Sequence, residues 1–375
     1  MIYYVVPEKE PFSAYSGGAV ARFVANMMRY DSSSRVICPS FDDTWGLSPD
    51  RAIALPGWRA YARIKGRKLL PRWIYKAVLS RMFRPLISLL REGDIVWCHN
   101  EPYVAAALER MIHSKHARLV CQYHDSLLVE GRHSVYRSFT ADASLFVSEF
   151  MRQEGLRQFP QLEHTYVLCN GADEALFYPS PSKEAGTTAI PVILYVGRLV
   201  RDKGVHVLID AMRILQARKI QAVCRIVGAS FFGGSKTTSY VRSLHMSSPS
   251  NVHFSGHCIQ TEIAEEYRAA DILCCPSIWQ EPFGNVNIEA MACGIPVAAT
   301  RVGGVPEIAS EGGIVLVEQN SAAALADALQ KLVEDKGLRT EIGAKGLQSF
   351  RKNYTWAVIY GRWQEVLNRM EANVG

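Results

Sequence analysis

Two glutamates and a short loop in the last third of the chain have the residue types and the spacing to bind a sugar phosphate. Glu281 and Glu289 are separated by seven residues, beginning with Pro282-Phe-Gly284. Gly284 lets the backbone approach a ligand closely, and we expect a helix with Pro282 in its first turn and Gly294 at its end. Free N–H groups at a helix start attract anions, and carboxylates accept hydrogen bonds from hydroxyls. The segment therefore predicts a site for phosphate and sugar together.

A second cluster of charged residues follows a predicted strand. Gly197 comes directly after the apolar run 192–196, and Arg198 and Lys203 stand in the loop before a helix that is expected from Val205. Two cations at a strand-to-helix turn can neutralise a diphosphate, and arginine can do so with two hydrogen bonds. Alone, the pattern also fits a surface loop with ordinary ion pairs, but beside the Glu281–Glu289 segment it favours phosphate binding.

The elements that must position these residues alternate between short apolar strands and amphipathic helices. Strands are expected at residues 2–6, 35–39, 94–98, 118–122, 144–147, 166–168, 192–196, 222–227, 252–254, 272–275 and 313–317. This alternation is typical of an α/β fold with doubly wound parallel sheets. A polar stretch interrupts the rhythm, and two Rossmann-like domains facing a cleft are expected. The predicted parts are an N-terminal Rossmann-like domain (1–180), a linker (181–189), a C-terminal Rossmann-like domain (190–350) and a C-terminal helix that packs back toward the N-terminal domain (351–375).

Composition describes a globular protein of ordinary polarity. Of the 375 residues, 48% are hydrophobic and 21% charged, and no apolar run reaches the roughly 18 residues that span a bilayer. We expect the first residues to form a core strand rather than a signal peptide. Nine cysteines without a Cys-x-x-Cys pair indicate reduced core residues, hence a cytoplasmic protein.

Positive charge is concentrated in one segment of the first domain. Residues 51–91 contain eleven Lys or Arg and no Asp or Glu, interleaved with aromatic residues. Such a segment favours an anionic membrane surface or a lipid-linked acceptor, although a solvated basic face remains the alternative. No motif of a nucleic-acid-binding fold accompanies it. The residues expected to contact membrane or acceptor are Trp58, Arg63, Lys65, Arg67, Lys68, Arg72, Trp73 and Lys76.

Together, these motifs resemble those of a known enzyme family. Val196-Gly-Arg…Lys203-Gly with Glu281-Pro-Phe-Gly…Glu289-Ala-Met-Ala is similar to glycosyltransferase family four, retaining sugar-nucleotide transferases of the GT-B fold. The resemblance covers the whole chain and includes Gly17-Gly18, Tyr123-His-Asp and Asn170-Gly. The stretch 227–236 is also similar to transferases related to a bacterial spore-coat protein.

The resemblance implies that the domain of residues 1–180 binds the acceptor and that the domain of residues 190–350 binds the nucleotide sugar. It also implies a role for each matching residue. Arg198 and Lys203 bind the donor diphosphate and stabilise the leaving nucleotide, while Glu289 accepts hydrogen bonds from the ribose. Glu281 lies near the donor sugar and His124 contacts the sugar or the transferred centre, so Glu281, His124, Arg198 and Lys203 are the catalytic candidates. The other donor-binding candidates are Gly17 and Gly18 beside the diphosphate, Gly256 and His257 beside the base, and the backbone N–H groups of Phe283, Gly284, Asn285 and Val286.

The resemblance also implies the reaction. A sugar moves with retention from a nucleotide diphosphate sugar, a UDP- or GDP-sugar first of all, to a glycan or lipid-linked acceptor in bacterial polysaccharide or glycoconjugate synthesis. Cations and helix N–H groups placed where the leaving diphosphate gains charge make a divalent metal unnecessary, and the chain has no Asp-x-Asp pair. We therefore expect no cofactor and no metal. A peripheral association with the inner face of the plasma membrane is left open.

Two other functions fit the same fold. A sugar-nucleotide 2-epimerase also consists of two Rossmann-like halves, but it gives no reason for the spacing of Glu281 and Glu289. A non-catalytic glycan-binding coat protein would have no use for Arg198, Lys203 and both glutamates together. Neither alternative is excluded by the residues alone.

Overall fold

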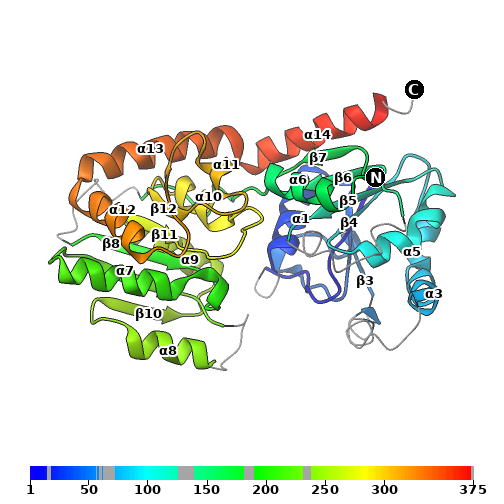
Figure 1. Cartoon of the computed structure of the whole chain (residues 1–375). Helices are drawn as coiled ribbons and strands as arrows, with labels where there is room; N and C mark the ends of the chain where they lie inside the picture. Colours follow the sequence, from blue (N-terminus) through cyan, green and yellow to red (C-terminus); the bar gives the residue numbers. More distant parts are fainter. Residues whose placement is uncertain are drawn as a thin grey trace. The chain divides into compact units, whose positions relative to one another are not determined.

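The computed structural model describes residues 1–14, 18–55, 57–58, 61, 72–125, 139–180, 190–230 and 238–372. Its contacts divide the chain into two units, Met1–Cys169 with Tyr360–Gly375, and Asn170–Ile359 (Figure 1). The second unit thus begins at Asn170 and ends at Ile359, whereas the sequence places these boundaries at 190 and 350. The predicted linker, 181–189, lies outside the described residues.

The first unit is built on a seven-stranded sheet with the order β3-β2-β1-β4-β5-β6-β7, in which every pairing is parallel. The strands are β1 (Ile2–Val5), β2 (Arg35–Cys38), β3 (Ala52–Ala54), β4 (Ile95–His99), β5 (Arg118–Tyr123), β6 (Ala143–Phe146) and β7 (Thr165–Val167). The short β3 has only three residues and was not predicted.

Helices and short turns connect these strands. They are α1 (Ala19–Tyr30), α3 (Arg72–Met82), α4 (Arg84–Leu89), α5 (Pro102–His113) and α6 (Glu149–Gln158), with 3₁₀ turns η1 (Asp43–Trp45) and η2 (Pro49–Arg51). The last helix, α14 (Trp356–Ala372), places Trp363 against Trp97 of β4, with ring centroids 4.0 Å apart. Both rings are fully buried, so this contact ties the end of the chain to the first unit.

The second unit is built on a six-stranded parallel sheet with the order β10-β9-β8-β11-β12-β13. The strands are β8 (Val192–Val196), β9 (Val223–Val227), β10 (Val252–Gly256), β11 (Ile272–Cys275), β12 (Val297–Thr300) and β13 (Ile314–Val317). Counted from β8, this is the order 3-2-1-4-5-6 of a Rossmann fold, which reverses direction between its first and fourth strands. Here that point lies between β8 and β11.

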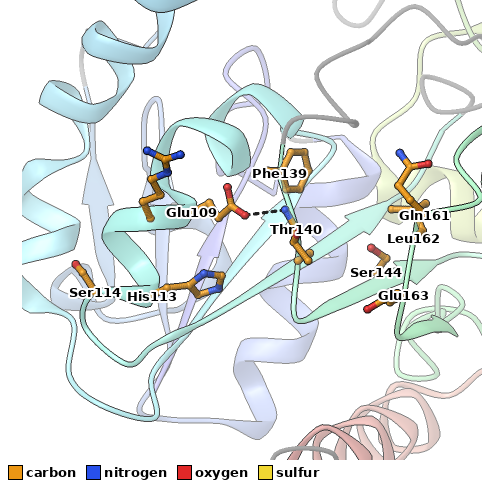
Figure 2. A pocket seen from close by; sticks show the side chains of 11 residues that line it. Glu109, His113, Ser114, Phe139, Thr140, Ser144, Gln161, Leu162 and Glu163 are labelled. Atoms are coloured by element: carbon orange, nitrogen blue, oxygen red, sulfur yellow. Dashed lines mark hydrogen bonds between the residues drawn. The ribbon is translucent and has the colours of Figure 1, made fainter.

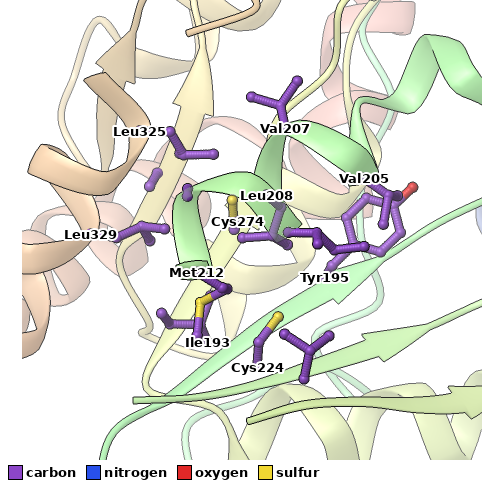
Figure 3. Close-up of a cluster of buried hydrophobic side chains, with 14 of the residues drawn as sticks. Ile193, Tyr195, Val205, Val207, Leu208, Met212, Cys224, Cys274, Leu325 and Leu329 are labelled. Carbon is purple, nitrogen blue, oxygen red and sulfur yellow. The ribbon is translucent and has the colours of Figure 1, made fainter. Parts of the chain in front are cut away.

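Both faces of this sheet are covered, as the continuous apolar strands predict. The helical elements are η4 (Arg201–Lys203), α7 (Val205–Ala217), α8 (Ser239–Ser247), α9 (Gln260–Ala269), α10 (Asn285–Ala292), α11 (Val305–Ala309), α12 (Ala322–Glu334) and α13 (Lys336–Asn353). On one face, Ile193 and Tyr195 of β8 pack in a buried cluster with residues of α7 and α12 (Figure 3). Their neighbour Leu194 is also fully buried but lies outside this cluster, consistent with the alternation of side chains between the two faces of a strand. The predicted α/β fold with doubly wound parallel sheets is confirmed.

One local expectation differs from the structure. Helix α10 begins at Asn285, so Pro282 precedes it instead of lying in its first turn. The cause is Gly284, whose positive φ of 106° ends the loop and cannot be part of a right-handed helix. Gly294 does adopt a left-handed conformation just after the helix, as predicted. Within the described residues, no helix is long and apolar enough to cross a bilayer.

Candidate functional site

The loops that follow β8 and β11 meet at the reversal point of the second sheet. Because β8 and β11 are adjacent and parallel, their carboxyl ends lie side by side, which is where open α/β sheets bind ligands. The first loop (197–204) carries Arg198 and Lys203, and the second (276–284) carries Glu281. The fold therefore brings the two sequence motifs to one place.

Backbone contacts hold the two loops together. The Ile278 N–H donates to the carbonyl of Asp202 at 2.8 Å. Gly204 has a φ of +69°, and a Cβ there would lie 1.9 Å from the carbonyl oxygen of Pro276. Since no other residue type could approach that closely, Gly204 is needed for the fit between the loops.

The centre of the site is a buried carboxylate with two donors. Glu281 is 5% exposed, and its Oε1 accepts hydrogen bonds from Lys203 Nζ and from Ser277 Oγ, both at 2.5 Å. Lys203 Nζ also lies 5.1 Å from the centroid of the Trp279 ring. A buried charge is tolerated only when it is paired and hydrogen-bonded, and Glu281 meets both conditions.

The rest of the 276–284 loop is fixed by residues that follow β12. Thr300 Oγ1, at the end of that strand, donates to the carbonyl of Ser277 at 2.6 Å. The Gly304 N–H donates to the carbonyl of Glu281 at 2.8 Å. The position of the Glu281 side chain is therefore determined by a neighbouring strand as well as by its own loop.

Arg198 is exposed, in contrast to Lys203. Its backbone carbonyl accepts a hydrogen bond from the Tyr195 hydroxyl at 2.8 Å. Burial raises the pKa of Tyr195 well above its usual value, so the hydroxyl stays neutral and can donate. No hydrogen bond or ion pair engages the Arg198 guanidinium within the part of the chain that the structure describes. The side chain is thus a free cation at the carboxyl end of β8.

Further predicted residues of this unit lie on helix α10 or just before it. Phe283 is buried and packs edge-on against Tyr354, and Asn285 Oδ1 accepts from Asn170 Nδ2 at 2.8 Å. Glu289 Oε2 accepts a hydrogen bond from the Tyr267 hydroxyl at 2.9 Å. Burial, and then the Glu289 charge, raise the pKa of Tyr267 well above its usual value, so Tyr267 is a permanent donor to this carboxylate.

The Val286 carbonyl accepts a second, longer contact of 3.3 Å from Tyr267. Gly256 and the exposed His257 lie at the carboxyl end of β10, the edge strand, with β9 between them and β8. They lie at the same edge of the sheet as Arg198 and Lys203. Their predicted place beside the base stays a prediction.

In the first unit, the start of α1 already holds an anion. Glu10 Oε1 accepts from the Ala21 N–H at 2.7 Å, and a Cβ at Gly18 would lie 2.7 Å from the same oxygen. Burial raises the pKa of Glu10, and the hydrogen bonds from this backbone oppose the rise. The helix start that was predicted to meet the donor diphosphate is therefore occupied by a carboxylate of the chain itself. Gly17 lies outside the described residues.

His124 follows β5 and pairs with a second histidine. Its Nε2 lies 2.9 Å from Nδ1 of His99, and its Nδ1 is buried. Burial lowers the pKa of His99 well below its usual value, and the neighbouring His124 adds to this effect, so His99 is neutral. In this conformation His124 directs both ring nitrogens inward, and a contact with the sugar would need the ring to turn.

The predicted surface of residues 58–76 is only partly described. Trp58 is fully buried and packs edge-on against Phe83, so the prediction that it contacts a membrane or an acceptor is wrong. Arg63, Lys65, Arg67 and Lys68 lie outside the described residues. Trp73 and Lys76 are exposed on α3, which begins at Arg72.

A cavity of about 720 Å³ lies elsewhere in the first unit, among the C-terminal end of α5 and the segments before β6 and β7 (Figure 2). Glu109, which lines it, accepts from the Thr140 N–H at 2.8 Å. None of the predicted site residues lines this cavity. It is at the amino ends of β6 and β7, away from the strand ends where His124 lies.

Three residues of the site were missed by sequence reasoning. Ser277 stands in the Glu281 loop but has no special spacing, and Thr300 and Tyr267 lie in other elements that carry no recognisable motif. Only the pairing of strands brings Thr300 to Ser277. The available signal was a hydroxyl four residues before Glu281 in the same loop, and it concerns Ser277.

Comparison with known proteins agrees with this geometry. Residues 182–349 match the family model described as "Glycosyl transferases group 1". The chain is 31% identical over 250 residues to alpha-maltose-1-phosphate synthase of Mycolicibacterium smegmatis, which covers 62% of this chain and 64% of that protein. It is 26% identical over 227 residues to spore coat protein SA of Bacillus subtilis, covering 56% and 60%. The chain thus spans somewhat less than two thirds of the length of these relatives.

A solved structure of similar architecture is that of Anabaena Alr3699/HepE in complex with UDP and glucose. It superposes with a TM-score of 0.74 and 21% identity, over 98% of this chain and 99% of that chain. This likeness concerns the fold, and it confirms the predicted GT-B class of two Rossmann-like domains. The family resemblance read from the two motifs is confirmed as well, and residues 182–349 are a domain of the glycosyl transferases group 1 family.

Proposed function

We propose that the protein is a retaining, metal-independent glycosyltransferase that moves a sugar from a nucleotide diphosphate sugar to a glycan or lipid-linked acceptor. One observation carries the proposal: the Lys203–Glu281 pair and the free Arg198 guanidinium lie at the reversal point of a Rossmann-type sheet. Such a site combines two cations for a diphosphate with a carboxylate for the sugar. We infer retention of configuration and a role in polysaccharide synthesis from the resemblance to glycosyltransferase family four.

The chemistry that this site supports is the departure of a diphosphate from an anomeric carbon. As the sugar–phosphate bond breaks, negative charge grows on the leaving group and positive charge on the sugar. Arg198 and Lys203 stabilise the first and Glu281 the second, because preorganised charges act strongly in a partly buried site. Backbone N–H groups at the start of α10 add to the stabilisation of the diphosphate.

The donor is a UDP- or GDP-sugar. The HepE structure, which was solved with UDP and glucose, supports a UDP-sugar. The names of the similar alpha-maltose-1-phosphate synthase and spore coat protein SA do not identify the sugar of the donor. Glu289 is the residue that binds the ribose in this proposal. Its second oxygen is held by Tyr267, which orients the carboxylate.

A thermal-shift panel with UDP-, GDP- and ADP-glucose tests the donor site. A nucleotide sugar that binds only the folded protein raises its melting temperature by mass action. Replacing Glu289 with alanine removes charge-assisted hydrogen bonds of about 1.5–3 kcal/mol, so donor affinity falls by about 10- to 100-fold. Isothermal titration of the selected donor measures the change.

The matched control for this variant is Glu341→Ala, which removes an exposed glutamate of α13. It keeps wild-type affinity. If no nucleotide sugar stabilised the protein, or if Glu289→Ala bound the donor as tightly as the wild type, the proposed donor site would be wrong. Appearance of an epimerised donor in place of free nucleotide would favour the 2-epimerase.

We further propose that α3 brings the first unit to an anionic membrane that carries a lipid-linked acceptor. Trp73 is 71% exposed, and Lys76 is exposed one turn later on the same helix. An exposed indole beside cations favours the interface of an anionic bilayer. Among the predicted contact residues whose side chains the structure describes, Trp73 and Lys76 are the two that are exposed to solvent.

Sedimentation with phosphatidylglycerol vesicles tests this contact. The double variant Trp73→Ala, Lys76→Ala reduces the bound fraction at least about fivefold, since each charge near an anionic surface contributes about 1 kcal/mol. Added salt weakens wild-type binding in the same way. Met246→Ala, which removes an exposed apolar side chain of the second unit, binds like the wild type. Equal binding to neutral and anionic vesicles would contradict the proposal.

A further inference from the structure

Two hydrogen-bond donors, Lys203 and Ser277, contact the same oxygen of Glu281. Only the lysine is also expected to bind the donor diphosphate. Lys203 Nζ and Ser277 Oγ both lie 2.5 Å from Oε1. No hydrogen bond reaches Oε2 from any residue that the structure describes. Oε1 is therefore the anchored atom of the carboxylate, and Oε2 is the atom left to face a ligand.

Lys203 has a second task in the proposed function, on which this inference rests. A lysine is a flexible point charge, and a diphosphate carries more negative charge than one carboxylate. When the donor binds, the ammonium group is drawn toward the diphosphate. Among the residues that the structure describes, Lys203 is the cation that pairs with Glu281, so Glu281 then stays buried without its ion-pair partner. A buried carboxylate that loses its partner is strongly disfavoured unless another donor holds it.

Ser277 has no such freedom. It is 1% exposed, and its carbonyl is bound by Thr300 Oγ1 at 2.6 Å. It follows Pro276 directly at the end of β11, so its backbone is fixed on both sides. A serine hydroxyl on a fixed backbone stays within reach of Oε1 whether or not Lys203 is present.

We propose that Ser277 is a positioning residue, which holds the Glu281 carboxylate in its productive orientation after the donor diphosphate has drawn Lys203 away. Thr300 supports Ser277 from the neighbouring strand. The lysine thus serves the empty site and then the diphosphate, while the serine serves Glu281 throughout. Lys203 was predicted from the sequence, whereas Ser277 and Thr300 were not.

The test is the kinetics of nucleotide release from UDP-glucose, or from GDP- or ADP-glucose if the thermal-shift panel selects one of these. Ser277→Ala lowers kcat by about 10- to 100-fold, because a misplaced catalytic group costs about that much. The KM for the donor stays within about twofold of the wild type, since the diphosphate contacts remain. Ser277→Thr, which keeps a hydroxyl, recovers most of the lost rate.

A double variant separates positioning from general damage. In a Glu281→Gln background, Ser277→Ala causes little further loss of kcat, because residues that act through one another are not additive. A purely structural role predicts the opposite, an independent loss that follows the melting temperature. If Ser277→Ala retained wild-type kcat, or if the two losses multiplied, the inference would be overturned.

Failure of this inference is distinct from failure of the proposed function. If no nucleotide sugar is turned over, or if Glu281→Gln is fully active, the proposed function itself is wrong. If the wild type turns over the donor, Glu281→Gln is impaired and Ser277→Ala is unaffected, only the role of Ser277 is wrong.

Discussion

Replacing Glu281 with glutamine lowers kcat by about two to three orders of magnitude and changes donor affinity by less than about threefold. The amide keeps the shape of the side chain and can still accept from Lys203 and Ser277, which both contact Oε1. What it removes is the negative charge that stabilises the developing positive charge on the sugar. Losses of about 10²–10³ in kcat are typical when one such electrostatic group is removed.

Steady-state kinetics with the selected donor, and titration of its binding, measure the two quantities separately. Glu289→Ala is the matched comparison, because it changes a glutamate of the same motif and is expected to act on affinity. A Glu281→Gln variant whose donor affinity fell as far as its kcat would show that both glutamates bind the donor in the same way.

Replacing Arg198 with alanine lowers kcat/KM by about 10²- to 10³-fold without lowering the melting temperature. The guanidinium is exposed and bonds to no residue that the structure describes, so its loss leaves no buried group unpaired. The effect comes from lost stabilisation of the leaving diphosphate. UDP should lose more affinity than UMP, because the second phosphate is the group that the cation meets.

Lys203→Ala gives a similar kinetic loss with an added cost in stability. Its side chain is 21% exposed and that of Glu281 is 6% exposed, and breaking a buried pair from one side costs about 3–5 kcal/mol. Differential scanning calorimetry therefore distinguishes the two cations. Arg201→Ala, an exposed cation of the same loop, is the control with unchanged kinetics. An Arg198→Ala enzyme with wild-type discrimination between UDP and UMP would exclude the diphosphate contact.

The sequence was sufficient to predict the fold and to expect Arg198, Lys203 and Glu281 at one edge of a sheet. Apolar runs such as Val192–Val196 are long enough and regular enough to define strands, and the glycine and proline residues that bound them define the turns. The motifs around Arg198 and Glu281 lie next to strand ends, so a parallel sheet brings them to one edge wherever the strands are placed. For this reason their joint role could be predicted before the strand order was known.

Other features of the fold and the site depend on contacts that no local sequence pattern indicates. Trp58 lies in a basic segment, but only the packing of Phe83 decides that its ring turns inward. Glu10 occupies the start of α1 although eight residues separate it from α1. Thr300 and Tyr267 gain their importance from Ser277 and Glu289, which lie in other elements. In each case the determining partner is distant in sequence, and a pattern of spacing cannot identify it.

The separation of Lys203 from Glu281 also bears on how the protein folds. The two residues are 78 positions apart, and their loops meet only after β8 has paired with β11. The helices and strands between them, β9 and β10 included, have to be synthesised before that pairing can form. Non-local pairing of this kind is slow compared with local helix formation. The Lys203–Glu281 ion pair is therefore expected to be among the later contacts that the chain makes as it folds.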